Sequence, residues 1–378
     1  MELINFDNAA TTFPKPPSVL QAASDAAAVL GGNAGRGGHR LSLRTSEAVY
    51  SARELIAETF GALPENVVFT LNCTHALNLA IQGIMSGGGH LIISGLEHNS
   101  AARPAAAMAA EGRITLSVAQ VFPDDEQTVE SFRSLIRRDT KAIVCTLASN
   151  VTGQLLPIGE IAGLCRERGI CLIADGAQAC GVIETGLAEG INILCTAGHK
   201  GLYGLSGTGL LISDGKFPIK PVIQGGTGNL SASLRQPVLL PEALESGTLN
   251  VPGILSLKAG VEFVRSKGTK AILAHESALC ETFISSLADV ENVTVYRENG
   301  ASYAPIVSFN ISGIAPEAAA AALAEKGFCL RAGLHCAPLA HANNGTRNGT
   351  VRFSPSVFSR RPDVLRLVKN IKELCSNK

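Results

Sequence analysis

The stretch ICLIADGAQACGVIETGLAEGINILCTAGHKG, residues 170–201, contains two short apolar runs, each followed by a side chain that can do chemistry. The first run, 170–175, ends in Asp175, and the second, 191–196, is followed four residues later by Lys200. Short apolar runs bounded by glycines and small residues predict buried strands. Ligands of α/β proteins bind beyond the carboxyl ends of such strands, so we expect both side chains to face one crevice.

The rest of the first two thirds of the chain shows the same alternation of apolar runs and helical spacing. Strands are predicted at 66–70, 90–94, 141–147 and 207–213, and helices at 74–85, 126–138 and 158–169. Strands that alternate with helices predict an α/β domain with a largely parallel central sheet.

From about residue 253 the pattern changes to that of a smaller α+β domain. Helices are predicted at 253–268, 271–289, 316–327 and 362–375, strands at 293–298, 304–312 and 349–356, and a loop at 331–341. The sequence therefore predicts a large domain, 14–252, and a small domain formed by 1–13 and 253–378, which includes that loop.

Composition limits the class of protein. The chain has 378 residues, 46% hydrophobic and 17% charged, which predicts a large buried core. Lys plus Arg and Asp plus Glu number 32 each, so charge gives no reason to expect nucleic acid or an anionic membrane as partner. No signal peptide, membrane span or C-x-x-C motif is visible, so we expect a cytoplasmic protein with reduced cysteines and no structural metal.

Taken alone, Lys200 and Asp175 have ordinary explanations, because lysines usually lie at the surface and a strand-end aspartate often caps the next helix. Together they indicate a carbonyl cofactor. A lysine amine forms a Schiff base with a carbonyl, and an acid can pair with a cationic ring nitrogen.

This order of acid and lysine is seen in fold-type I pyridoxal phosphate enzymes. The chain resembles the class V aminotransferase family, most closely its cysteine desulfurases related to NifS and SufS and the selenocysteine lyases. The matching motifs are DNAATT (7–12), GRGGHRLS (35–42), CTHALNLA (73–80), LEHNS (96–100), SNVTGQLLPI (149–158), ADGAQA (174–179), GHKGLYG (198–204), SGTLNVPGI (246–254) and RAGLHCAP (331–338). They follow the family's order and cover nearly the whole chain. The resemblance implies a pyridoxal phosphate-dependent enzyme that is a homodimer.

The resemblance implies which residues hold the cofactor ring. Lys200 would carry pyridoxal phosphate covalently, and Asp175 would keep the ring nitrogen protonated, which makes the ring an electron sink. Gln178 would bond the phenolic oxygen. His98 would stack on the ring face and, with Lys200, would be catalytic.

The phosphate would lie at the start of a helix, where Thr74 and His75 stand and free N–H groups suit an anion. His199 would add a donor, and Thr248 of the partner subunit would add another. Ala197 stands where the family usually has a hydroxyl residue, and His75 where it often has Glu. We expect a cationic His75 to compensate for the missing hydroxyl.

The loop 331–341 contains the implied nucleophile, Cys336. Asn150, also a cofactor residue, and Arg352 would hold the substrate carboxylate, because a planar guanidinium binds a carboxylate at two points. Sulfur of L-cysteine would pass to Cys336 as a persulfide, leaving L-alanine. The short interval to Arg352 resembles the SufS branch, which commonly needs a sulfur-acceptor protein.

The other polar and sulfur groups near this loop have alternative interpretations. His335 and His341 either lower the thiol pKa and move protons or are ordinary polar loop residues. Cys329 is interpreted as a core residue and Cys73 as a structural one.

Other functions stay open from the sequence. A selenocysteine lyase acts on L-selenocysteine with the same scaffold, and the sequence does not separate it from a desulfurase. Other class V activities have no use for Cys336, and a catalytically inactive protein would not need Lys200, Asp175, His98 and Arg352 together. No G-x-G-x-x-G follows the first strand, which disfavours a Rossmann protein. The pathway, whether iron–sulfur cluster assembly, thionucleotide synthesis or selenium metabolism, is not indicated.

Overall fold

A computed structural model describes residues 3–35, 37–228 and 232–376. Its central feature is a seven-stranded sheet with the order β2-β8-β7-β6-β5-β3-β4. The strands are β2 (Val67–Thr70), β3 (His90–Ser94), β4 (Thr115–Ala119), β5 (Thr140–Thr146), β6 (Cys171–Asp175), β7 (Ile193–Ala197) and β8 (Gly209–Ser213). Neighbouring strands from β4 to β7 are parallel, and β8 is antiparallel to both β7 and β2. The predicted α/β class with a mostly parallel sheet is confirmed.

Burial explains which strands the sequence predicts. The strands β3, β6, β7 and β8 are buried along their whole length, so their sequences are continuous apolar runs. β4 was not predicted. It lies at the edge of the sheet and is exposed or half-buried at four of its five positions, so it carries the polar residues Thr115 and Ser117.

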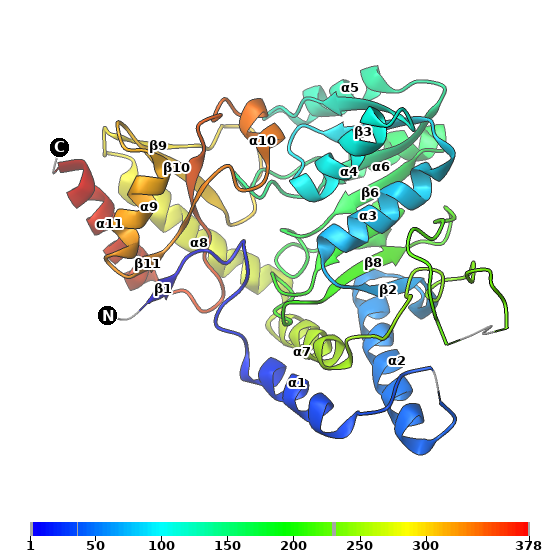
Figure 1. The fold of residues 1–378 in the computed structure, drawn as a ribbon. Helices are drawn as coiled ribbons and strands as arrows, with labels where there is room; N and C mark the ends of the chain where they lie inside the picture. Colours follow the sequence, from blue (N-terminus) through cyan, green and yellow to red (C-terminus); the bar gives the residue numbers. More distant parts are fainter. Residues whose placement is uncertain (1–2, 36, 229–231, 377–378) are drawn as a thin grey trace.

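Helices cover both faces of this sheet (Figure 1). They are α1 (Pro17–Val29), α2 (Arg40–Phe60), α3 (Cys73–Ile84), α4 (Asn99–Ala110), α5 (Asp125–Leu135), α6 (Ile158–Arg168) and α7 (Val251–Lys267). Alternate residues of a strand face opposite sides. Ile92 of β3 accordingly packs in one hydrophobic cluster with α2, α6 and α7, while Leu91 and Ile93 pack in another with α3 and α4.

The C-terminal part forms a second, smaller unit with its own core. It contains the strands β9 (Val293–Val295), β10 (Val307–Ile311), β11 (Phe328–Cys329), β12 (Arg331–Gly333) and β13 (Thr350–Phe353), and the helices α8 (Thr269–Leu287), α9 (Pro316–Ala324), α10 (Pro338–Asn343) and α11 (Arg361–Ser376). Four strands form an antiparallel sheet in the order β12-β13-β10-β9. Phe283 and Phe353 stack in its core with ring centroids 4.4 Å apart.

The N-terminus belongs to this smaller unit. β1 (Ile4–Asn5) pairs in parallel with β11, and Figure 1 shows the blue β1 beside the orange and red C-terminal elements. The presence of a further domain is confirmed. The exact division at 14–252 stays a prediction, and α7 packs in the same cluster as the central sheet. Arg36, part of the motif at 35–42, lies outside the described residues.

No helix among the described residues is long and apolar enough to cross a membrane. The described residues also contain no group of three or more His, Cys, Asp or Glu side chains placed to hold a metal ion.

Candidate active site

A cavity of about 190 Å³ lies at the carboxyl ends of β6 and β7. It brings together seven of the predicted site residues: Thr74, His98, Asn150, Asp175, Gln178, His199 and Lys200. The strands place these side chains together because parallel strands end at the same edge of the sheet.

Asp175, the last residue of β6, is held by three donors. Its Oδ1 accepts hydrogen bonds from the backbone N–H of Ala177 at 2.9 Å and from Cys73 Sγ at 3.4 Å. Ser100 Oγ lies 3.5 Å from Oδ2. The carboxylate is therefore fixed by the first turns of α3 and α4 and points into the cavity.

Cys73 and Ser100 are site residues whose contacts sequence reasoning missed. Cys73 was interpreted only as structural, and it does lie buried, at 7% exposure. Burial, followed by the nearby Asp175, raises the pKa of the Cys73 thiol well above its usual value, so the group stays a thiol and donates. Its position, adjacent to the predicted phosphate turn, was the available signal.

Lys200 lies in the turn after β7, where its carbonyl accepts hydrogen bonds from Tyr203 N at 2.8 Å and Thr12 Oγ1 at 3.0 Å. Desolvation lowers the pKa of its amine, and the carboxylate of Asp175 opposes this effect. A lowered pKa favours the neutral amine, which is the form that attacks carbonyl groups and accepts protons.

The start of α3 is the place where the sequence predicts phosphate binding. Asn72 caps the helix by accepting from His75 N at 2.8 Å. His75 Nδ1 accepts from Leu71 N at 3.2 Å, so the hydrogen sits on Nε2, which is buried without a partner. Burial lowers the pKa of His75, which disfavours the cationic ring expected there. The neutral ring still offers one free donor.

His199 and Thr248 line two different cavities, and both cavities include Asn72 and Thr74 at this helix start. His199 Nδ1 is buried without a partner, and burial, followed by the charges of Lys200 and Lys15, lowers the ring's pKa to about 4. Thr248 does not reach the cavity of Lys200. It lines a second cavity of about 460 Å³ together with Thr74 and His75.

His98 and Gln178 complete the wall of the cavity. His98 caps α4, with Nδ1 accepting from Ser100 N at 3.0 Å, and burial is the main cause that lowers its pKa to about 4. A neutral, fixed imidazole suits a stacking role. Gln178 is anchored by a 3.0 Å hydrogen bond from Nε2 to the carbonyl of Ala9.

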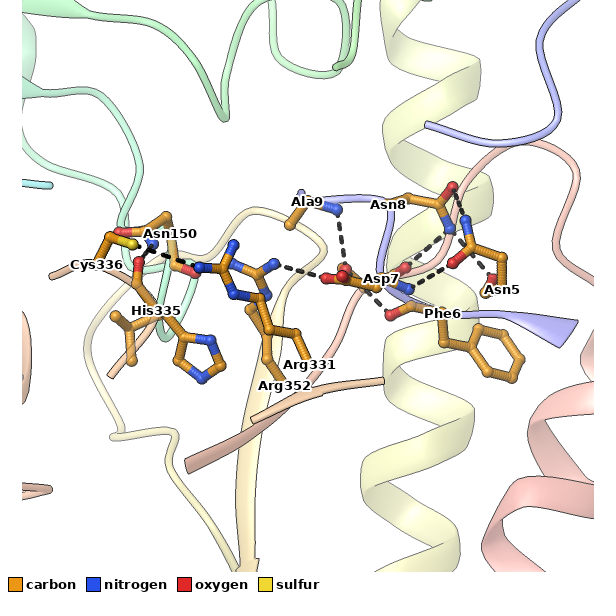
Figure 2. A network of polar contacts seen from close by, with 12 residues as sticks. Asn5, Phe6, Asp7, Asn8, Ala9, Asn150, Arg331, His335, Cys336 and Arg352 are labelled. Atoms are coloured by element: carbon orange, nitrogen blue, oxygen red, sulfur yellow. Dashed lines mark hydrogen bonds and ion pairs between the residues drawn. The ribbon is translucent and has the colours of Figure 1, made fainter. Parts of the chain in front are cut away.

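Arg352, on β13 of the smaller unit, is the centre of a second network (Figure 2). It does not line the cavity of Lys200 but contacts Asn150, which does. The side chain is 1% exposed. Nη1 donates to the carbonyl of Asn150 at 2.8 Å, and Nη2 forms an ion pair of 2.7 Å with Asp7. Arg352 Nε, a donor, and Asn150 Oδ1, an acceptor, are buried without hydrogen-bond partners.

Cys336 is exposed and lies in a tight turn between β12 and α10, so the predicted loop at 331–341 is shorter than expected. Both His335 and Cys336 have positive φ angles, 49° and 56°, which non-glycine residues rarely adopt. The turn is held by hydrogen bonds from Asn150 Nδ2 to the carbonyl of His335 at 2.8 Å and from Asn99 N to that of Cys336 at 2.7 Å.

The flanking histidines are not exposed loop residues. His335 and His341 are 2% and 1% exposed, and their rings stack with centroids 5.7 Å apart. Burial, followed by the charge of Arg352, lowers the pKa of His335 to about 2, so it carries no positive charge toward the thiol. Cys329 is half-buried rather than fully in the core.

Arg331 is the cation that sequence reasoning missed. Its Nη2 lies 3.4 Å from Cys336 Sγ. The available signal was its position at the start of the RAGLHCAP motif, five residues before the cysteine.

Two of the cavities share lining residues. A further cavity of about 510 Å³ along α4 is lined by Cys336 and shares Thr74, His98 and Ser100 with the cavity of Lys200. Cys336 and Lys200 therefore line neighbouring cavities that have three residues in common.

The chain is similar to known proteins over nearly its whole length. A curated relative, a probable cysteine desulfurase of Methanothermobacter thermautotrophicus, is 29% identical over 97% of this chain and 94% of its own length. Another, from Halalkalibacterium halodurans, is 29% identical over 98% of this chain and 93% of its own length. The solved apo structure of a cysteine desulfurase from Thermococcus onnurineus NA1 superposes with a TM-score of 0.93 at 28% identity and covers 100% of this chain and 95% of that one. The family model for aminotransferase class V matches residues 4–367, and the chain belongs to that family.

Proposed function

We propose that this protein is a pyridoxal phosphate-dependent cysteine desulfurase, which converts L-cysteine to L-alanine and transfers the sulfur to Cys336. The observation that carries the proposal is that the cavity lined by Cys336 and the cavity lined by Lys200 and Asp175 share three residues, Thr74, His98 and Ser100. An exposed cysteine therefore lies next to the cavity that contains the lysine and the fixed aspartate. The relatives named cysteine desulfurase support it.

The residues present fit pyridoxal phosphate. The phosphate is an anion, and the start of α3 offers the free donor His75 Nε2, with the unpaired nitrogen His199 Nδ1 nearby. Thr74 would also bind the phosphate, as would Thr248 of the partner subunit. When bound, the cofactor supplies an electron sink that weakens the bonds at the substrate's α-carbon.

The ring would be held by the residues that line the smaller cavity. Lys200 would carry the cofactor covalently, and the carboxylate of Asp175 would hold the protonated ring nitrogen. Gln178 would bond the phenolic oxygen and His98 would pack on the ring face. The neutral imidazole of His98 can lie on an aromatic ring without placing a charge there.

The substrate carboxylate would bind Arg352 and Asn150. The guanidinium has N–H groups beyond the two that contact Asp7 and Asn150, and Asn150 already ties the turn of Cys336 to this site. Charge-assisted bonds of this type are among the strongest in proteins. Lys200, whose amine has a lowered pKa, would remove the α-proton of the substrate and return it.

Cys336 would act as the nucleophile. Its thiolate forms a bond to the sulfur of the substrate as the carbon–sulfur bond breaks, and the bonding electrons stay with the carbon fragment. That fragment gains protons and leaves as L-alanine, while Cys336 keeps the sulfur as a persulfide. The nearby guanidinium of Arg331 would stabilise the thiolate, a part that the buried neutral histidines cannot take.

Assembly and sulfur delivery are part of the proposal. Thr248 lies in a surface cavity bordered by the exposed apolar residues Leu71 and Ile223, which a second copy of the chain would cover in a homodimer. Cys336 is exposed, so a sulfur-acceptor protein can reach the persulfide. The thiol must be reduced to react, and we place the enzyme in the cytoplasm for that reason.

The test is release of alanine from L-cysteine and from L-selenocysteine by the pyridoxal phosphate-loaded protein and by its Cys336→Ala variant. We expect the variant to lose turnover of L-cysteine and to keep its bound cofactor. Cys329→Ala, seven residues upstream, is the matched control and should keep activity. Full cysteine turnover by Cys336→Ala would remove the persulfide role. A native protein that acts on L-selenocysteine alone would instead be a selenocysteine lyase.

A further inference from the structure

Two arginines face each other across β12 and β13. Arg331 and Arg352 are register partners in this antiparallel pair, so their side chains extend from the same face of the sheet. Like charges directly opposite each other destabilise a strand pair. Figure 2 shows the two guanidinium groups between Cys336 on one side and Asp7 on the other.

Asp7 supplies the compensating charge. Its carboxylate contacts Arg352 Nη2 at 2.7 Å, and no other partner of this carboxylate occurs among the described residues. The backbone around Asp7 is fixed separately, because Asp7 N donates to Asn5 Oδ1 at 3.0 Å and Ala9 N donates to Ser354 Oγ at 3.0 Å. The ion pair with Arg352 is thus the one contact that this carboxylate makes within the described part of the chain.

We propose that Asp7 sets the charge of the substrate pocket and thereby selects amino acids with an uncharged side chain. The inference rests on the proposed function, in which Arg352 binds the α-carboxylate of the substrate. Two guanidiniums and one carboxylate leave a single positive charge, which the α-carboxylate neutralises.

Arg331 lies where the side chain of the substrate would bind, so it is the cation that an acidic side chain would contact. Its guanidinium lies 3.4 Å from Cys336 Sγ, and the substrate's side chain must approach that sulfur. An acidic substrate side chain would lie next to Arg331. Asp7 and the substrate's α-carboxylate already neutralise the two guanidiniums, so the acidic side chain would add an uncompensated negative charge. Without Asp7, two guanidiniums would face two anionic groups.

Asp7→Asn is the variant that separates charge from position. Asparagine has nearly the same shape and keeps an oxygen that accepts from Arg352 Nη2. L-cysteine is compared with L-cysteine sulfinate, which yields alanine when its carbon–sulfur bond breaks, the electrons stay with carbon and sulfur dioxide leaves to become sulfite. No oxidant or reductant is needed for that reaction.

We expect Asp7→Asn to raise the ratio of kcat/KM for the sulfinate to kcat/KM for cysteine at least about tenfold, since a unit charge is removed beside a buried ligand site. Asp7→Glu keeps the charge and should keep the native ratio even if turnover falls. Glu58→Gln removes an equal charge from the exposed pair with Arg265 and is the control for net charge alone.

Binding gives a second measurement that does not depend on turnover. L-aspartate and L-alanine are titrated into the cofactor-loaded protein, and the change in cofactor absorbance reports the dissociation constant. Aspartate should bind Asp7→Asn about tenfold more tightly than the native protein, with alanine changed less than threefold.

The proposal is overturned if, in Asp7→Asn, both the sulfinate-to-cysteine ratio of kcat/KM and the aspartate-to-alanine ratio of dissociation constants stay within twofold of native. Asp7 would then be a purely structural residue. If Asp7→Asn does not fold, Arg331→Gln in the native background replaces it. That variant should weaken aspartate relative to alanine, and an unchanged ratio there overturns the proposal equally. A failure of the proposed function is seen separately, as a native protein that releases no alanine from L-cysteine.

Discussion

The backbone N–H of Asn99 donates a 2.7 Å hydrogen bond to the carbonyl oxygen of Cys336. Asn99 is the first residue of α4, and its neighbour His98 lines the cavity of Lys200. The turn that bears the thiol is therefore fastened to the helix that borders the cofactor site. Rotation of the Cys336 side chain, rather than an excursion of a long loop, would bring the sulfur to and from its target.

Lys200→Ala should abolish covalent attachment of pyridoxal phosphate, because no other lysine of the described residues lines the cavity beyond β6 and β7. The measurement is mass spectrometry after borohydride reduction, which adds the mass of the reduced cofactor to native protein only. Lys216→Ala, a surface lysine paired with Asp214, is the control. A reduced adduct in the Lys200 variant would place the attachment elsewhere.

Arg352→Ala should raise KM for L-cysteine at least about tenfold, because a charge-assisted hydrogen bond contributes roughly 1.5–3 kcal/mol. Initial rates over a range of L-cysteine concentrations measure this. The variant also leaves Asp7 without its partner, so Tm should fall. Arg352→Lys keeps the charge, so its KM for L-cysteine should lie between those of the native protein and of Arg352→Ala. An unchanged KM in Arg352→Ala would contradict the assigned role.

Ser100→Ala should weaken cofactor binding about two- to tenfold, because one hydrogen bond near Asp175 is worth roughly 0.5–1.5 kcal/mol. Ser100 Oγ lies 2.9 Å from His98 Nδ1 and 3.5 Å from Asp175 Oδ2, so its loss loosens both groups. Titration of the apo protein with pyridoxal phosphate gives the dissociation constant. Ser134→Ala on the exposed end of α5 is the control, and equal affinities in both variants would be the contrary result.

Glu276→Gln should change the pH dependence of stability. Burial raises the pKa of this carboxyl from 4.5 to about 8, opposed by a hydrogen bond from the backbone of Val357. Between these values the folded protein keeps a proton that the unfolded chain has released, so the free energy of unfolding falls as pH rises from 4.5 to about 8.

Glutamine has no proton to lose, so Glu276→Gln should match the native Tm at pH about 5 and exceed it at pH about 8. Thermal unfolding at the two pH values measures the difference. Glu281→Gln, on the exposed face of the same helix, should show no such gain. An equal Tm difference at both pH values would show that the carboxyl is ionised in the folded protein.

The sequence predicted the elements whose burial shows in composition. β6 and β7 are continuous apolar runs, and the meeting of Asp175 with Lys200 follows from strand ends sharing one edge of a sheet. β4 was not predicted because an exposed edge strand carries polar residues. The family resemblance also predicted that Cys336 belongs to the site, and in the structure this cysteine lines a cavity that shares residues with the cavity of Lys200.

Contacts set by tertiary packing could not be predicted. The burial of His335, which keeps it neutral, depends on Thr350 and Arg352 in a strand that follows it. The ion pair of Asp7 with Arg352 joins residues 345 positions apart, and no periodicity in the sequence connects them. Pattern and spacing report the neighbours of a residue along its own element, whereas these contacts arise between elements.

The pairing of β1 with β11, and of Asp7 with Arg352, also has a consequence for how the protein is made. A ribosome makes Asp7 345 residues before Arg352, so all strands of the central sheet, with Asp175 and Lys200, are made before the proposed partner of the substrate's carboxylate exists. Closing so long a loop is entropically unfavourable and slow. The segment that contains β1 and Asp7 therefore stays unpaired until β11 and β13 have been made. With the proposed site residues, a nascent chain would be able to take up the cofactor before it could recognise an amino acid.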